Sequence, residues 1–184
     1  MLPKIVFIVI THINKSSAAY TGISAEPYYV VDVNSNFKIT NLFEFKDGLG
    51  LTYDPATGRN YALSGFSTGN QLSEICGYSS IPIATLSPPN VVLSCLASGP
   101  SGVMALNIAS LEVEYGKLDT TKGNFKSLGA LPGPYGLYVF AQDNDGLLHY
   151  INGAGDYYTS RGPNKKMKIV DDITFSYSIC WILW

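Results

Sequence analysis

Short runs of alternating apolar and polar residues predict β-strands along most of this chain. Within the segment 37–45, most of the apolar side chains occupy odd positions, at Phe37, Ile39, Phe43 and Phe45. A two-residue period is typical of a strand with one buried and one solvated face. The run Tyr28–Val33 is apolar and rich in β-branched residues, which predicts a buried strand. Asn34–Asn36 and Asp47-Gly48 separate such runs with turn residues, so the pattern predicts many short strands.

The turns recur at a fixed interval, because Gly58, Gly102 and Gly146 stand 44 residues apart between strand-like runs. In the first of these turns, proline presets φ, Asp54 caps the turn and Gly58 supplies a positive φ. A period of roughly 40–50 residues with about four short strands is typical of a propeller blade. The turn Asp54–Tyr61 follows a strand that begins with an aromatic residue, and this combination resembles the repeats of secreted β-propeller proteins in general.

We therefore predict an all-β protein, a β-propeller of about four four-stranded blades in a single domain, residues 1–184. The predicted blades are residues 23–66, 67–110, 111–155, and 156–184 together with 1–22. The fourth unit lacks its last strand, so the N-terminal strand is expected to complete it and close the ring. The apolar residues expected in these closing strands are Ile5, Phe7, Val9, Trp181 and Trp184. Pro82, Pro88 and Pro89 limit strand pairing, which places part of the second blade at a sheet edge or bulge.

The N-terminal segment has two interpretations. Lys4 and the apolar run Ile5–Ile10, followed by Ser16–Ala19, resemble a short signal peptide. The competing interpretation is favoured, because Asn14–Gly22 aligns with Thr57–Gly65, 43 residues later, and this alignment predicts strands. No apolar run reaches the ~20 residues of a membrane span. Both ends stop inside a predicted blade, as they would in a piece of a larger propeller.

Composition and charge exclude some partners. Charged residues make up 14% of the chain and the net charge is −2. Lys165, Lys166 and Lys168 form the one cluster of positive charge, which is typical of a solvated hairpin turn. Binding to nucleic acid needs several cations on one face, so nucleic acid is not an expected partner. The resemblance to secreted propellers implies an extracellular or cell-surface location.

Cysteine and histidine spacing predicts neither a metal site nor a cofactor. Cys76, Cys95 and Cys180 allow one disulfide and one free thiol, or three buried thiols. Cys95 takes the place of Leu51 in the repeat, which favours a core thiol. Asp143–Gly146 begins like a calcium loop, but a glutamate is required at position 152, where the chain has asparagine. A hairpin turn is the expected structure.

Catalytic residues are not predicted, and we expect a non-enzymatic protein. His12 and His149 lie in candidate strands without a recognisable nucleophile, and no Gly-x-Ser-x-Gly sequence occurs. Asp171 and Asp172 are adjacent, so on a strand their carboxylates would point to opposite faces.

Tyrosines are the best candidates for ligand binding. They open the predicted first strands of three units, at Tyr28, Tyr29, Tyr115, Tyr157 and Tyr158. In propellers that strand lines the central channel, so the rings could stand at its mouth and stack on sugars. The alternative is that these rings fill the gaps between blades. Asn14-Lys-Ser16 is a candidate glycosylation site.

Three functions follow as hypotheses. The first is a non-catalytic extracellular binding module with a glycan or protein ligand. The second is a filament-forming structural subunit, in which the N-terminal segment of one copy adds as a strand to the next copy. The third is a propeller hydrolase or lactonase, with a metal or triad at the channel mouth.

Overall fold

The computed structural model describes residues 20–23, 29–33, 39–45, 48–65, 70–109, 112–131, 138–151, 157–160 and 180–182. Within these ranges every regular element is a β-strand, which confirms the all-β prediction. Among these same residues, no helix is long and apolar enough to cross a bilayer.

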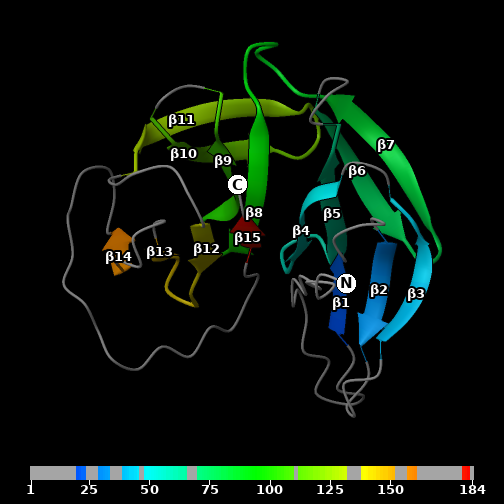
Figure 1. The fold of residues 1–184 in the computed structure, drawn as a ribbon. Coiled ribbons are helices and arrows are strands. Elements are labelled where there is room, and N and C mark those ends of the chain that lie inside the picture. Colours follow the sequence, from blue (N-terminus) through cyan, green and yellow to red (C-terminus); the bar gives the residue numbers. More distant parts are fainter. Residues whose placement is uncertain are drawn as a thin grey trace, which may run out of the picture.

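The strands form four antiparallel sheets (Figure 1). The first sheet contains β1 (Tyr20–Ile23), β2 (Tyr29–Val33) and β3 (Ile39–Glu44), in the order β1-β2-β3. The second contains β4 (Gly48–Asp54), β5 (Arg59–Ser64), β6 (Gln71–Cys76) and β7 (Ser79–Thr85), in sequence order.

The third sheet contains β8 (Leu93–Gly99), β9 (Gly102–Asn107), β10 (Glu114–Asp119) and β11 (Asn124–Ala130), again in sequence order. The fourth contains β12 (Tyr138–Gln142), β13 (Leu148–Ile151), β14 (Tyr157–Ser160) and β15 (Cys180–Ile182), in the order β14-β13-β12-β15.

The sheet boundaries correct the predicted blade boundaries. The predicted blade 23–66 joined β2 and β3 to β4 and β5, but β4 and β5 belong to a sheet with β6 and β7. The predicted divisions after residues 66, 110 and 155 each fall in the middle of a sheet. The physical reason is that a repeat has the same period wherever counting begins. Spacing alone therefore does not show at which residue one blade ends and the next begins.

The three repeated turns have the predicted backbone conformation. The φ angles of Gly58, Gly102 and Gly146 are 71°, 89° and 77°, in the left-handed region that favours glycine. Each turn joins the first two strands of a run of consecutive strands, β4–β5, β8–β9 or β12–β13. The predicted blade boundaries would instead have placed each turn near the end of its blade.

The two chain ends do not share a sheet among the described strands. The N-terminal segment was expected to complete the last blade, but its described part, β1, pairs with β2. β15, which contains Trp181, pairs antiparallel with β12. Closure of a ring by the N-terminal segment is therefore not seen in the described residues.

The strand β8 lies at the centre of the described core. All seven of its residues are buried, and it packs against β4, β12 and β15 (Figure 1). One hydrophobic cluster joins the second and third sheets and includes Leu63 and Leu96. Another joins the third and fourth sheets and includes Met104 and Phe140. The core therefore lies between neighbouring sheets, as expected for stacked blades.

Cys95 is buried in the core, as its place in the repeat predicted, but it is not a free thiol. It is disulfide-bonded, whereas Cys76 is free and exposed. The repeat register correctly placed the side chain, but burial does not distinguish a thiol from a disulfide.

Polar links join the second and third sheets at several places among the described residues, one of them from Asn70 Nδ2 to the carbonyl of Leu93 at 2.6 Å. Near the centre, Thr52 Oγ1 donates to Ser98 Oγ at 3.0 Å. Near the outside, the amide of Ser87 donates to the carbonyl of Gly123 at 2.9 Å, and the amide of Phe125 donates to the carbonyl of Ser87 at 2.8 Å. Pro82 lies in β7, an edge strand, and the β6–β7 pairing is irregular at Leu72 and Ser73, as expected for this proline.

Candidate functional site

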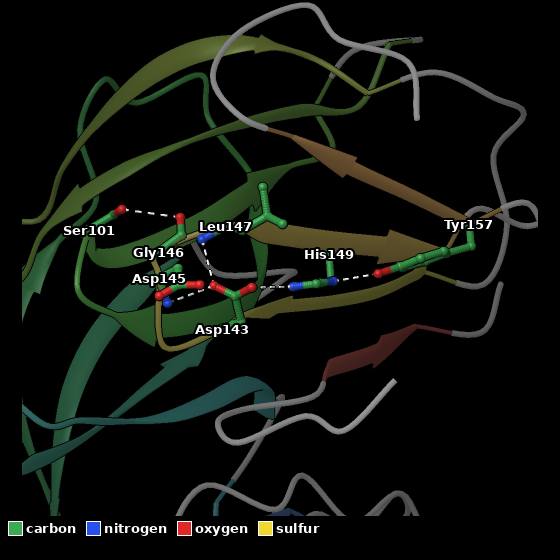
Figure 2. Close-up of polar contacts among 7 residues, drawn as sticks. All are labelled: Ser101, Asp143, Asp145, Gly146, Leu147, His149 and Tyr157. Atoms are coloured by element: carbon green, nitrogen blue, oxygen red, sulfur yellow. Dashed lines mark hydrogen bonds and ion pairs between the residues drawn. The ribbon is translucent and has the colours of Figure 1, made fainter. Parts of the chain in front are cut away.

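The hairpin turn between β12 and β13 is held by one carboxylate (Figure 2). Asp143 Oδ1 accepts hydrogen bonds from the backbone amides of Asp145 at 2.9 Å and Leu147 at 2.8 Å. Ser101, from the β8–β9 turn of the third sheet, donates its hydroxyl to the carbonyl of Gly146 at 3.3 Å. The carboxylate is thus used to hold a hairpin turn, and the described residues contain no group of three metal-ligating side chains.

The same carboxylate begins a network of three side chains, Asp143, His149 and Tyr157. Asp143 Oδ2 lies 3.0 Å from His149 Nε2, and His149 Nδ1 lies 2.5 Å from the hydroxyl oxygen of Tyr157 (Figure 2). The side chains of His149 and Asp143 are 12% and 28% exposed, and Tyr157 is 8% exposed.

Strand pairing brings the three side chains of this network together. β13 pairs with β14 so that His149 lies opposite Thr159 and Ile151 lies opposite Tyr157. His149 and Tyr157 are therefore diagonal neighbours on one face of the sheet, within reach of each other for aromatic side chains. Their rings are stacked, with centroids 6.0 Å apart and an interplanar angle of 12°.

Burial and hydrogen bonds shift two pKa values in this network. Burial alone would raise the pKa of Asp143, but hydrogen bonds from His149 and the amides of Leu147 and Asp145 outweigh it and lower that pKa. Burial raises the pKa of Tyr157, and the negative charge of Asp143 adds to this effect. A neutral imidazole protonated at Nε2 satisfies both partners, because Nε2–H donates a hydrogen bond to Asp143 and Nδ1 accepts one from the Tyr157 hydroxyl.

This network is better suited to holding the turn than to catalysis. An aspartate–histidine pair can activate a third group, but an activated nucleophile needs access and a pKa that favours deprotonation. Tyr157 has a buried ring and a raised pKa. A comparable link occurs in the second sheet, where the hydroxyls of Thr57 and Tyr61 lie 3.4 Å apart and Thr57 donates to Asp54 at 2.8 Å.

The described tyrosines of the predicted site lie mostly in the core. Tyr115 is 3% exposed, and its hydroxyl has no hydrogen-bond partner among the residues that the structure describes. Tyr157 is held by His149. Tyr158 is half-buried and stacks on Tyr150, with ring centroids 5.2 Å apart. Tyr115 and Tyr158 belong to the cluster between the third and fourth sheets, so these rings fill a gap between neighbouring sheets.

The other predicted site residues are only partly within the described ranges. Tyr29 lies in β2 and Trp181 lies in β15, where it is opposite Val139. The remaining ones lie outside the described residues: Ile5, Phe7, Val9, Asn14, Tyr28 and Trp184.

Sequence reasoning overlooked an exposed apolar pair on the β6–β7 hairpin. Tyr78, in the turn, is 77% exposed, and Ile81, in β7, is 52% exposed. A signal was present, because Gly77-Tyr78 is a glycine-containing turn between two strand-like runs. A large aromatic residue at such a turn is expected to face solvent.

Two of the three comparisons with known proteins found no match. No family model matches the chain, and no curated protein does.

Two solved structures are similar in fold. One is a catalytically inactive variant of virginiamycin B lyase from Staphylococcus aureus with quinupristin, at 12% identity and a TM-score of 0.54. The other is TolB from Acinetobacter baumannii, at 10% identity and a TM-score of 0.57. The matches cover 90% and 98% of this chain but only 58% and 44% of those chains. Together with the stacked antiparallel sheets, these likenesses show that the chain has a β-propeller fold.

Proposed function

We propose that this chain is a non-catalytic binding module whose ligand is a protein surface contacted by Tyr78 and Ile81. The observation that carries the proposal is the exposure of these two side chains on the outermost hairpin of the second sheet. Tyrosine is enriched at protein interfaces, because its ring contributes apolar area and its hydroxyl remains hydrogen-bonded.

The hairpin that carries Tyr78 is fixed by strand pairing and by a side-chain hydrogen bond. Cys76 pairs with Ser79 at the end of the ladder, and the Ser79 hydroxyl donates to the carbonyl of Cys76 at 3.2 Å. On the neighbouring strands, Arg59 pairs with Glu74 at 3.2 Å. A contact residue on an ordered turn loses less conformational freedom on binding, which favours affinity.

A protein ligand is better supported than a sugar stacked on the predicted tyrosines. Tyr115 and Tyr157 are buried and do not offer a face to a ligand. The hydroxyl of Tyr157 is held by His149 Nδ1 at 2.5 Å, which supports a structural role for this side chain. The disulfide of Cys95 supports an extracellular or cell-surface location, because disulfides persist in oxidising compartments.

Site-specific photocrosslinking tests this proposal. A photoreactive phenylalanine replaces Tyr78 in one sample and Thr57, in an exposed turn, in the control. Each protein is mixed with surface proteins of the source cells, and crosslinked species are identified by mass spectrometry. We expect a partner that crosslinks at position 78 and not at 57.

The affinities of hairpin variants for the purified partner then test the proposed contact residues. Tyr78→Ser and Ile81→Ser should each weaken binding about tenfold or more, as for interface anchors, and Thr57→Ser should leave it unchanged. Unchanged affinity in both hairpin variants would refute the proposed site. Binding of neutral sugars on a glycan array by the Tyr78→Ser variant would favour a glycan ligand instead.

One observation favours self-assembly as a second candidate function. The first sheet has three described strands, whereas each of the other sheets has four. A strand from another copy that paired with β1 would give this sheet four strands and join copies into a filament. Light scattering over a concentration series tests this, and a monomer at the highest concentration would exclude it.

A further inference from the structure

The β10–β11 hairpin of the third sheet places two lysines directly opposite each other. Lys117 in β10 pairs in register with Lys126 in β11, and both side chains are exposed. Residues opposite each other in an antiparallel pair lie on the same face, with their Cβ atoms about 4.5–5.5 Å apart. The two lysine side chains therefore lie on the same face, at the outer strands of a sheet whose inner part is buried on that face at Met104.

Among the described residues, most of the positive charge lies on this hairpin. The structure describes four lysine and arginine side chains, and three of them lie here: Lys117, Lys122 and Lys126. The fourth, Arg59, lies on the second sheet and pairs with Glu74. Within the described part of the chain, no ion pair joins the three hairpin lysines to a carboxylate.

The carboxylate of Asp119 holds the hairpin turn, and hydrogen bonds from Thr121, with a smaller contribution from the positive charge of Lys122, lower the pKa of this carboxyl. Asp119 Oδ1 accepts hydrogen bonds from the amide and hydroxyl of Thr121, at 2.8 and 2.6 Å, and from the Lys122 amide at 3.1 Å.

The carboxylate of Glu114, at the other end of the hairpin, is also occupied. It accepts from Asn107 Nδ2 at 2.9 Å and from the Ser127 hydroxyl at 3.1 Å. Within the described residues, neither carboxylate forms an ion pair with Lys117 or Lys126.

We propose that this hairpin face binds an anionic polysaccharide through its sulfate groups, which Lys117 and Lys126 contact and Lys122 flanks. Like charges directly opposite each other destabilise a sheet, so the pair is unfavourable in the unbound protein. An oxyanion between them removes that repulsion, and lysine binds oxyanions as a point charge. Both lysine side chains are exposed on the two outer strands of the third sheet, where an extended polymer can reach them. The disulfide of Cys95 supports the compartment in which such polymers occur.

Binding to three polyanions tests the proposal. The probes are heparin, which is sulfated, hyaluronate, which has only carboxylates, and polyphosphate. We expect heparin to bind with an affinity that falls as salt rises, and hyaluronate not to bind. Absence of heparin binding at low salt would overturn the proposal, and so would binding to polyphosphate alone.

A charge-matched control separates this face from a general charge effect. Lys117→Gln and Lys126→Gln should each weaken heparin binding about two- to five-fold, the scale of one exposed charge contact. Arg59→Gln, which removes the same charge from another sheet, should leave binding unchanged. Equal losses in all three variants would overturn the proposed site.

Thermal unfolding measures the repulsion between the two lysines, and heparin binding by a Tyr78 variant shows whether this face acts independently of Tyr78. Lys126→Gln should unfold at the same or a slightly higher temperature than the parent protein, because it removes the repulsion, and a lower temperature would contradict the premise. Tyr78→Ser should keep heparin binding, so failure of the protein-binding proposal and failure of this one are distinguishable.

Discussion

At the scale of single residues, the side chain of His149 in β13 links the β12–β13 turn, through Asp143, to the neighbouring strand β14, through Tyr157. The sequence predicts both a hairpin turn at Asp143–Gly146 and a strand at His149. It does not predict the contact with Tyr157, because that contact depends on the register between β13 and β14. Local pattern identifies the elements, and pairing decides which side chains meet.

Removing the hydroxyl of Tyr157 should destabilise the protein. We expect Tyr157→Phe to lower the free energy of unfolding by about 1 kcal/mol, because His149 loses a hydrogen-bond partner in a mostly buried place. Urea denaturation measures the change. Tyr78→Phe is the control, because that hydroxyl faces water, and equal losses in both variants would contradict the expectation.

The carboxylate of Asp143 should make stability depend on pH in the acid range. Its folded pKa lies below the ordinary value of 3.8, so it stabilises the fold above that pH. This contribution is lost as the pH falls through the folded pKa. The difference in unfolding free energy between the parent and Asp143→Asn should therefore be largest near neutrality and shrink below about pH 4.

Thermal unfolding from pH 7 to pH 2.5 measures this difference, with Asp145→Asn as the exposed control. A difference between the parent and Asp143→Asn that stays constant across the range would show that the carboxylate charge has no part in stability.

At the scale of elements, hydrogen-bonded sheets are joined to one another at few points. The Ser87–Asn124 bridge brings Gly123, in the β10–β11 turn, against the end of β7. A Cβ built on Gly123 would lie 2.9 Å from the Cβ of Ala84 and 2.9 Å from the carbonyl oxygen of Thr85. This glycine is therefore required both by its turn and by the neighbouring sheet.

Two glycine substitutions separate these requirements. Gly58 has a φ of 71° with open space around its Cβ position, whereas Gly123 has a φ of 70° and the close contacts just described. We expect Gly58→Ala to cost about 1 kcal/mol, from backbone strain alone. Gly123→Ala should cost about 2 kcal/mol or more, because steric conflict is added. Equal costs in chemical denaturation would contradict the proposed contact.

At the scale of the whole molecule, the repeat period predicted the architecture but not its phase. Spacing and alternation are properties of local sequence, and they correctly indicated antiparallel strands, repeated positive-φ turns and a β-propeller fold. The division between sheets depends on which connections cross between blades. One such connection, residues 86–92, contains Pro88 and Pro89, which the repeat spacing had placed inside a blade.

The predicted tyrosine site shows a similar limit of sequence reasoning. The alternation pattern shows that an aromatic side chain faces one side of a sheet, but the neighbouring sheet decides whether that side is covered. Tyr115 is covered in the structure, and Tyr78, at a turn beyond the sheets, is not.

The disulfide of Cys95 should stabilise the whole domain, because β8 packs against several strands. Its reduction is expected to lower the free energy of unfolding by about 2–4 kcal/mol. Denaturation with and without a reductant measures this. In unfolded, unreduced protein, an alkylating reagent should modify Cys76 and leave Cys95 unmodified until reductant is added, and modification of Cys95 beforehand would contradict the disulfide.

Gly50 shows how closely the two innermost described strands of the second and third sheets approach. A Cβ built on it would lie 3.2 Å from the amide nitrogen of Leu96 and 3.3 Å from the carbonyl oxygen of Ser94. Main chain thus faces main chain, with no room between β4 and β8 for a guest molecule or a line of water. A ligand therefore cannot pass between β4 and β8 at Gly50, and would have to bind this part of the molecule elsewhere.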